Sequence, residues 1–440
     1  MHLLRACGTQ CLLPNLAYLD ATLTQQADSA NISKILLLIS PSLRKVRITA
    51  PASIALPILN SLQTHAPNIA ILQISTSAST LISSHFISAI CLFPQLQEII
   101  IKVYNSDHDS DDPSVNTNLF TRISSNRTLR RFSLTGRTRF VSSISDLACE
   151  AVEFPSLEHI DLHCPLTSIN PIASILESMT LPTLESLLIS FDMSVKPTIP
   201  FENLGWLRFF SSIAKIPTNR FKDLTISSHS YAQEPASHWK DVGLTLSEFP
   251  DLDGLSLEKF NIKLPILHSV NLSDVQKTIK FWPGLRELSL KSCRPSKLGF
   301  GVLVDIALGL PNLSDLTLSI DIQELPIPDE IPLLGHSLCR LELEISSMPQ
   351  PGIMEFAQCV DKIFPGLYFW GFSCSNYPNV QNEATQILNM LKRARGYEAK
   401  RASLRLKGWT GTMDKIGMYL LLLNVLQRPF YPLFQRTDSL

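Results

Sequence analysis

One short run of the sequence places three side chains that could bind a metal ion at alternate positions. It is His159-Ile160-Asp161-Leu162-His163. On one face of a β-strand successive side chains are ~6.6 Å apart, so the two histidines would lie ~13 Å apart, too far to share an ion. A zinc site completed by a neighbouring strand stays open as an alternative. We predict no metal here and expect His159, Asp161 and His163 to act as surface contacts.

A second run, residues 105–112, has aspartates at alternate positions, as calcium-binding loops do. Such a loop needs a glycine for its turn and a bidentate glutamate at its end. Asp112 and Asn118 occupy those two positions. We therefore expect a solvated insertion, and we predict no metal and no cofactor for the chain.

The sequence lacks the usual signatures of catalysis and of a membrane. It contains no phosphate-binding glycine loop, no nucleophile elbow and no His-Glu-x-x-His motif, so we predict that the protein is not an enzyme. Its nine cysteines form no Cys-x-x-Cys pair. The start of the chain has no apolar signal core, and the apolar run 416–426 is shorter than the ~20 residues of a membrane helix. We expect a soluble protein of the cytoplasm or nucleus with no membrane partner.

The composition indicates a large core and argues against nucleic acid. Hydrophobic residues make up 45% of the 440 residues and charged residues only 18%, so much of the chain must be buried. With 38 Lys and Arg against 39 Asp and Glu, the chain lacks the basic excess of most nucleic-acid-binding proteins. The 29 prolines outnumber the 17 glycines, which inverts the usual order.

The prolines belong to an internal repeat. Its phrase is an apolar residue, Pro, any residue, then Leu-x-x-Leu-x-Leu, and clear copies start at Phe154 and Trp282. We call the first Leu of each copy its anchor; ten of the 29 prolines stand two residues before an anchor. The mean anchor spacing of about 29 residues is at the upper end of the range for leucine-rich repeats. The anchors are Leu16, Leu43, Ile69, Leu96, Leu129, Leu157, Leu184, Phe221, Leu252, Leu285, Leu313, Leu338 and Leu367.

Each repeat is predicted to contain a strand, a turn and a helix. Leu-x-x-Leu-x-Leu places its last two leucines on one face of a strand, and the stretches 81–90, 172–179, 302–308 and 354–363 have helical spacing. Proline then ends each helix. One such unit cannot bury its apolar face alone. We therefore predict an α/β leucine-rich-repeat solenoid, a horseshoe of about 13 repeats with a concave parallel sheet and convex helices.

We expect the chain to form two parts, a solenoid and a C-terminal cap. The solenoid should cover residues 1–375, and residues 376–440 should form a C-terminal cap. In the cap we predict a helix over 383–395, a last strand over 402–406 and a hydrophobic helix over 418–426 that covers the open end of the solenoid.

The period, the Leu-x-x-Leu-x-Leu phrase and the Phe-Pro-x-Leu lead-in resemble the ribonuclease-inhibitor-like repeats of fungal F-box/leucine-rich-repeat proteins. The resemblance covers about residues 13–375. It implies a substrate-recruiting arm of a cullin-RING ubiquitin ligase, in which an N-terminal F-box binds the ligase adaptor. The first anchor here is Leu16, and no F-box phrase is found in the sequence. The ligase link and a ligase-independent scaffold or inhibitor therefore both stay open.

Polar residues between the anchor-phrase leucines should lie on the concave face, where we expect a protein partner to bind. The early strands lean basic and the late ones acidic, so a partner of opposite charge polarity would fit. An ordinary solvated polar face is the alternative. The candidate residues are Lys45, Arg47, Glu98, Lys102, Arg131, His159, Asp161, His163, Glu258, Glu287, Asp315, Arg340, Glu342 and Glu344.

Overall fold

In a computed structural model the chain divides into two compact units, Met1–Thr385 and Gln386–Leu440. In the second unit, residues 386–393 form a helix in which Ile387 and Leu388 are buried. The run 105–112 and the elements predicted over 402–406 and 418–426 lie outside the described residues. No helix within the described ranges is long and apolar enough to cross a membrane. The structure describes residues 12–24, 29–77, 84–104, 114–116, 118–136, 139–141, 152–192, 205–217, 219–229, 246, 249, 252–267, 270–292, 296–346, 352–374 and 386–393.

The first unit is built on one sheet of thirteen parallel strands whose order follows the chain. Each strand pairs with the next one in register, and the one recorded irregularity lies between β13 and β14. The strands are β1 (Tyr18–Thr22), β2 (Lys45–Thr49), β3 (Ile71–Ser77), β4 (Glu98–Tyr104), β6 (Arg131–Thr135), β9 (His159–Pro165), β11 (Ser186–Asp192), β12 (Asp223–His229), β13 (Lys259–Leu267), β14 (Glu287–Ser292), β15 (Asp315–Ile320), β16 (Arg340–Ile345) and β17 (Phe369–Cys374).

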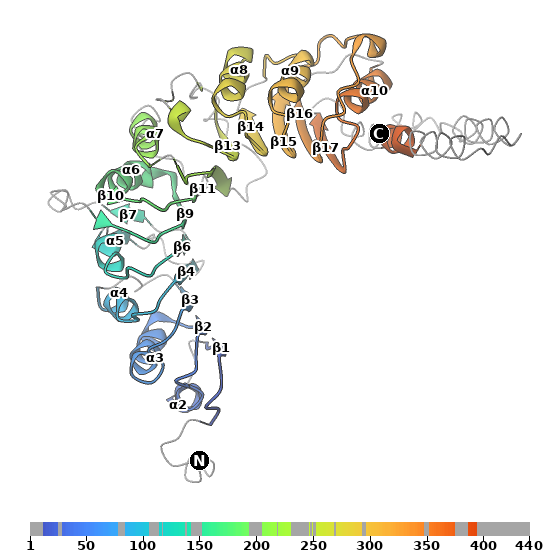
Figure 1. The fold of residues 1–440 in the computed structure, drawn as a ribbon. Helices are drawn as coiled ribbons and strands as arrows, with labels where there is room; N and C mark the ends of the chain where they lie inside the picture. The colour runs from blue at the N-terminus through green and yellow to red at the C-terminus, as the bar shows by residue number, and fades with distance from the viewer. Residues whose placement is uncertain are drawn as a thin grey trace, which may run out of the picture. The chain divides into compact units, whose positions relative to one another are not determined.

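Helices between these strands lie beside one another along one side of the sheet (Figure 1). The predicted helical stretches 302–308 and 354–363 are confirmed, and so is the described part of 81–90; the stretch 172–179 is helical up to Ser178, and Met179 begins a short strand. The first unit is thus a solenoid-like α/β fold. The helices are α2 (Ser29–Leu36), α3 (Ala52–His65), α4 (Ser84–Cys91), α5 (Asn118–Ile123), α6 (Ile169–Ser178), α7 (Trp206–Ala214), α8 (Leu272–Phe281), α9 (Gly301–Gly309) and α10 (Ile353–Ile363).

Short elements complete the description. Two small parallel pairs lie apart from the main sheet. They are β5 (Ser114–Asn116) with β7 (Arg139–Val141), and β8 (Val152–Glu153) with β10 (Met179–Thr180). Three 3₁₀ turns are η3 (Leu166–Ser168), η7 (Leu252–Gly254) and η8 (Pro328–Glu330).

The repeated proline sits in a tight turn that connects each helix to the next strand. The amide of Leu285 donates to the carbonyl of Trp282 at 3.1 Å, and Leu313 makes the same bond to Leu310 at 3.1 Å. Proline occupies the second position of these turns, where its fixed φ is favourable. The helices α8 and α9 end one residue before each turn begins. Proline therefore follows the helix end and helps to direct the chain into the strand.

Apolar side chains from the strands fill the space under the helices. On β3 and β14 the inward residues Leu72, Ile74, Leu288 and Leu290 are each at most 1% exposed. Burial of one such side chain contributes about 1.5–3 kcal/mol. Gly309 lets α9 approach α8 closely, because a Cβ atom at this position would collide with Ile279.

One predicted anchor is wrong. Leu252 lies in η7, and the strand begins only at Lys259, which pairs with Glu287 two residues after the anchor Leu285. Leu257 therefore holds the equivalent anchor position, five residues later than predicted. Two Leu-x-x-apolar-x-apolar phrases overlap here, and the second contributes Phe260 and Ile262 to the strand. Aromatic and β-branched residues favour strands, so the second phrase pairs in the sheet.

Candidate protein-binding surface

Three rows of side chains point away from the core on one face of the sheet, which we call the polar face. The alternation is clear on β2 and β9, where outward residues are partly or fully exposed and inward residues are buried. The first row is Tyr18, Lys45, Ile71, Glu98, Arg131, His159, Ser186, Asp223, Lys259, Glu287, Asp315, Arg340 and Phe369. The second and third rows lie two and four residues further along each strand.

The strand register places all but one of the predicted residues in these rows. Lys45, Glu98, Arg131, His159, Glu287, Asp315 and Arg340 lie in the first row. Arg47, Asp161 and Glu342 lie in the second, and Lys102, His163 and Glu344 in the third. Their role in binding stays a prediction.

Glu258 is the exception, because it precedes β13 and does not lie on it. Its carboxylate pairs with Lys222 at 2.7 Å and with Arg286 at 3.6 Å. Both partners also lie one residue before their strands. The misplaced anchor explains the error, since the strand starts two residues after Leu257. The hydrogen bond from Lys222 lowers the pKa of the Glu258 carboxyl.

The three polar residues of β9 do share one face, as predicted. His159, Asp161 and His163 are each partly exposed, while Ile160 and Leu162 are buried. The Asp161 carboxylate accepts a hydrogen bond from Ser133 on β6 at 3.0 Å. Among the residues that the structure describes, no group of three or more His, Cys, Asp or Glu side chains is placed to hold a metal ion.

The predicted acidic character of the late strands is largely compensated by basic neighbours. Lys259 pairs with Glu287 at 2.5 Å, and this contact raises the pKa of the lysine. Asp223 on the neighbouring strand β12 and Asp315 on β15, two strands away, act on the same amine. The sequence could not reveal this, because the pairs join residues of different repeats through the strand register.

A second lysine lies between two acidic side chains of the late strands. Lys291 reaches Glu344 at 3.1 Å and Glu342 at 3.4 Å. Partial burial of Lys291 opposes its charge, but the two glutamates outweigh this and raise its pKa. Burial raises the pKa of Asp223 on β12. The late strands therefore form a mixed network of charges and do not present a uniform acidic surface.

Small hydroxyl and amide side chains occupy the middle of the polar face, and we did not predict them. Ser190 and Ser227 hydroxyls are 2.7 Å apart across β11 and β12. Thr225 donates to Asp223 at 3.1 Å and accepts a weak bond from Asn261 at 3.4 Å. These serine, threonine and asparagine side chains occupy the same outward positions on their strands as the predicted charged residues. The alternation along each strand could therefore have identified them from the sequence. They give this part of the face several small polar side chains.

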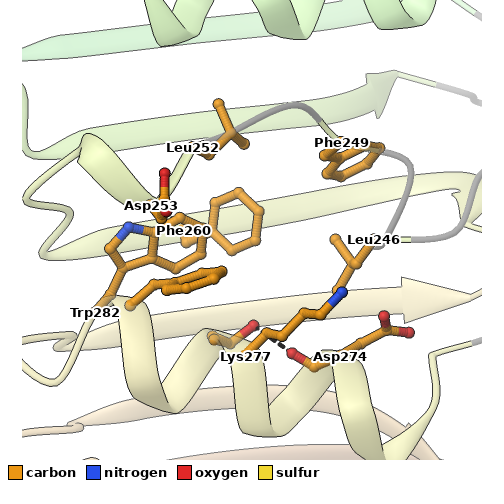
Figure 2. A pocket seen from close by; sticks show the side chains of 10 residues that line it. Leu246, Phe249, Leu252, Asp253, Phe260, Asp274, Lys277 and Trp282 are labelled. Atoms are coloured by element: carbon orange, nitrogen blue, oxygen red, sulfur yellow. Dashed lines mark hydrogen bonds between the residues drawn. The ribbon is translucent and has the colours of Figure 1, made fainter.

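The cavity in Figure 2 lies beside α8 and η7 and has a volume of ≈160 Å³. Aromatic and aliphatic side chains such as Phe249, Leu252 and Phe260 form much of its wall. Asp274 at its edge caps α8: its carboxylate accepts from the Asn271 amide at 3.0 Å. Lys277 extends toward Leu246 in the view. The cavity resembles in size an engineered apolar cavity that accepts benzene. Asp253, Asp274, Lys277 and Thr278 also line it, so its wall is mixed and does not select one class of ligand.

The described cysteines should differ strongly in reactivity. Cys339 is exposed and Cys164 is fully buried. Burial raises the pKa of both Cys91 and Cys359 to about 11. The thiolate is the reactive form, so at about pH 8 iodoacetamide should modify Cys339 well before Cys91, Cys164 and Cys359. Peptide mass spectrometry over time measures this order. Modification of Cys164 as fast as Cys339 would contradict the closed core, and a urea-unfolded sample gives the maximal rate as control.

The chain matches no protein-family model and no curated protein sequence.

Proposed function

We propose that the protein is a non-catalytic protein-binding module that receives a protein partner on its polar face. The observation that carries this proposal is the continuity of the three rows across thirteen parallel strands. The helices lie on the other side of the sheet and cover its buried apolar face (Figure 1). Outward side chains such as Arg131 and Arg340 are therefore available for contacts beyond the chain.

The dimensions of the polar face favour a protein over a small molecule. Twelve steps of ~4.8 Å between thirteen strands give a length of about 58 Å along the sheet. Three rows span about 13 Å along each strand, so the face covers about 750 Å². One side of a typical protein interface buries about 800 Å². Small ligands instead prefer enclosed, mainly apolar pockets.

The finer fold assignment belongs to the same proposal. We infer that each strand with its following helix is one leucine-rich repeat, that about 13 repeats form a horseshoe, and that the polar face is its concave side. The resemblance to F-box/leucine-rich-repeat proteins supports a substrate receptor that a cullin-RING ubiquitin ligase engages through its adaptor. A regulatory scaffold or inhibitor with no ligase link is the second candidate. The ion pairs within the late strands are compatible with both a substrate receptor and a scaffold or inhibitor.

A matched pair of serine substitutions tests the polar face. Ser227 lies in its third row, while Ser211 lies on α7 on the helix side. Ser227→Arg replaces a small hydroxyl between Ser190 and Lys263 with a long cation and should obstruct an approaching partner. We expect the full chain to capture a specific set of proteins from its own cell extract, with about tenfold less recovered by Ser227→Arg. Ser211→Arg should capture as much as the unmodified chain.

Quantitative mass spectrometry of the captured proteins decides between the candidates. Recovery of a cullin and its adaptor with the unmodified chain supports the ligase link, and their consistent absence leaves the scaffold. Equal capture by Ser227→Arg and the unmodified chain would refute binding on the polar face. Circular dichroism must first show that both variants keep the helix content of the unmodified chain.

A further inference from the structure

Exposed basic side chains gather at the start of strands β2 and β6. Lys45 and Arg131 lie in the first row, and Arg44 and Arg130 stand directly before them. All four are exposed. In the register, Lys45 is opposite Ile71, Ile71 is opposite Glu98, and Glu98 is opposite Arg131. Lys45 and Arg131 are therefore three strands apart, or about 14 Å.

The two arginines at β6 are held more loosely than Lys259 on β13. Arg131 lies 3.7 Å from Glu98, and Arg130 lies 3.7 Å from Glu158. Within the described residues neither contact is a hydrogen bond, whereas Lys259 is only 2.5 Å from Glu287. A guanidinium has five N–H donors arranged to match a carboxylate. Arg130 and Arg131 thus retain donors for a carboxylate supplied from outside.

The first row of the early strands also contains an apolar contact point. Ile71 lies between Lys45 and Glu98 in the first row and is partly exposed. On the other side, Lys45 lies over the ring of Tyr18 with its amine 5.5 Å from the ring centre. This contact leaves the amine at the surface. The row from β2 to β6 therefore presents, in order, a cation, an apolar side chain, the carboxylate of Glu98 and a second cation.

We propose that this row binds an extended acidic segment of a partner protein, in which two acidic residues four positions apart flank a central apolar residue. In an extended chain, residues four apart are ~13 Å apart on one face, close to the ~14 Å between Lys45 and Arg131. The middle residue of such a segment projects to the same face, between Ile71 and Glu98. The inference rests on the proposed function, because it names the chemistry of a partner on the polar face.

Carboxylates in and beside this row favour a peptide over nucleic acid. Asp20 lies 3.7 Å from Arg47, Glu98 lies 3.7 Å from Arg131, and Glu158 lies 3.7 Å from Arg130. A continuous phosphate backbone would bring negative charge close to all three acids. An acidic peptide can place its two carboxylates beside the cations and an uncharged side chain beside Glu98.

Fluorescence anisotropy with synthetic peptides tests the proposal on the full chain. The probe is a rhodamine-labelled peptide with Glu-Ser-Leu-Ser-Glu at the centre of a Gly/Ser frame. It should bind at low salt, and binding should weaken as salt is added. Moving the second glutamate two positions closer to the first should weaken binding several-fold, since the carboxylates would then be only ~6.6 Å apart. A peptide with lysines in place of the glutamates should not bind.

A charge-reversed double variant assigns the binding to this row. Lys45→Glu with Arg131→Glu should weaken binding about tenfold or more, because both proposed contacts become repulsive. Arg220→Glu with Lys297→Glu makes the same charge change at exposed residues off the three rows and should bind as the unmodified chain does. Circular dichroism and thermal unfolding establish that both variants are folded.

Three outcomes would overturn the proposal. They are equal affinity for both glutamate spacings, equal loss of binding in the two double variants, and tighter binding of a short single-stranded oligonucleotide than of the acidic peptide. Absence of peptide binding would also overturn it. If Ser227→Arg still abolishes protein capture in that case, the polar face keeps its proposed function and only the partner chemistry is wrong.

Discussion

Phe210→Ala is expected to destabilise the middle of the first unit by about 3–5 kcal/mol. Phe210 on α7 is fully buried, and its ring is 5.3 Å from Phe209 and 3.9 Å from Phe249 between ring centres. Trp206 stacks on the same ring at 6.1 Å. Removal of the ring leaves a cavity that the neighbouring rings can fill only in part. Urea unfolding followed by circular dichroism measures the loss.

The shape of the unfolding curve provides a second measurement for the same variant. Stacked repeats contact mainly their neighbours, so a weak repeat can separate the two flanking parts. We expect an earlier transition for Phe210→Ala, and a second one near the midpoint of the unmodified chain. Leu207→Ala on the same helix is the control: Leu207 is 54% exposed, and this change should cost less than about 0.5 kcal/mol. Equal effects of the two substitutions would contradict the packing of α7.

The fold could be predicted in outline because one short sequence phrase specifies the turn, the strand and the buried leucines of a repeat. At Leu285 the phrase contributes a turn, a buried Leu288 and Leu290, and a strand paired on both sides. Repetition of the phrase then requires parallel stacking. The misplaced anchor at Leu252 shows the limit, since two overlapping phrases both satisfied the pattern. The pairing of β13 with β14 shows that Leu257 is the anchor, and this pairing joins residues that are far apart in the sequence.

The polar face was predictable in position and much less so in chemistry. Alternation along β9 correctly placed His159 and Asp161 on the outward side. It could not show that Asp161 would receive a hydrogen bond from Ser133, 28 residues earlier in the chain. Nor could it show that Lys259 would neutralise acids of other repeats. Such contacts depend on which residues the register brings together, and a one-residue change of register would replace them all.

Lys259→Glu is expected to lower the free energy of unfolding by about 2 kcal/mol at neutral pH, because it reverses the one positive charge within an acidic group. Glu287 is 2.5 Å from the lysine amine, and the carboxylates of Asp223 and Asp315 also stabilise its charge. The lysine side chain is 42% exposed, so solvent screens each interaction to about 1 kcal/mol or less. The substitution removes three attractions and introduces three repulsions. Thermal or urea unfolding across a pH series measures the change.

The pH dependence distinguishes this electrostatic effect from a packing defect. In the variant a further carboxylate joins the acidic group, and repulsion within the group makes the folded state bind protons more readily than the unfolded state, whose carboxyls titrate near pH 4. The folded state then binds more protons than the unfolded one, so stability falls as pH rises through this window and recovers toward about pH 4. In the unmodified chain the opposite charge of Lys259 stabilises the fold below its ordinary pKa, and this contribution is lost only as pH rises through its raised pKa. Lys263→Glu, on the same strand but exposed and outside this acidic group, should show a smaller and flatter change. A loss for Lys259→Glu that stayed constant from acid to neutral pH would refute the electrostatic explanation.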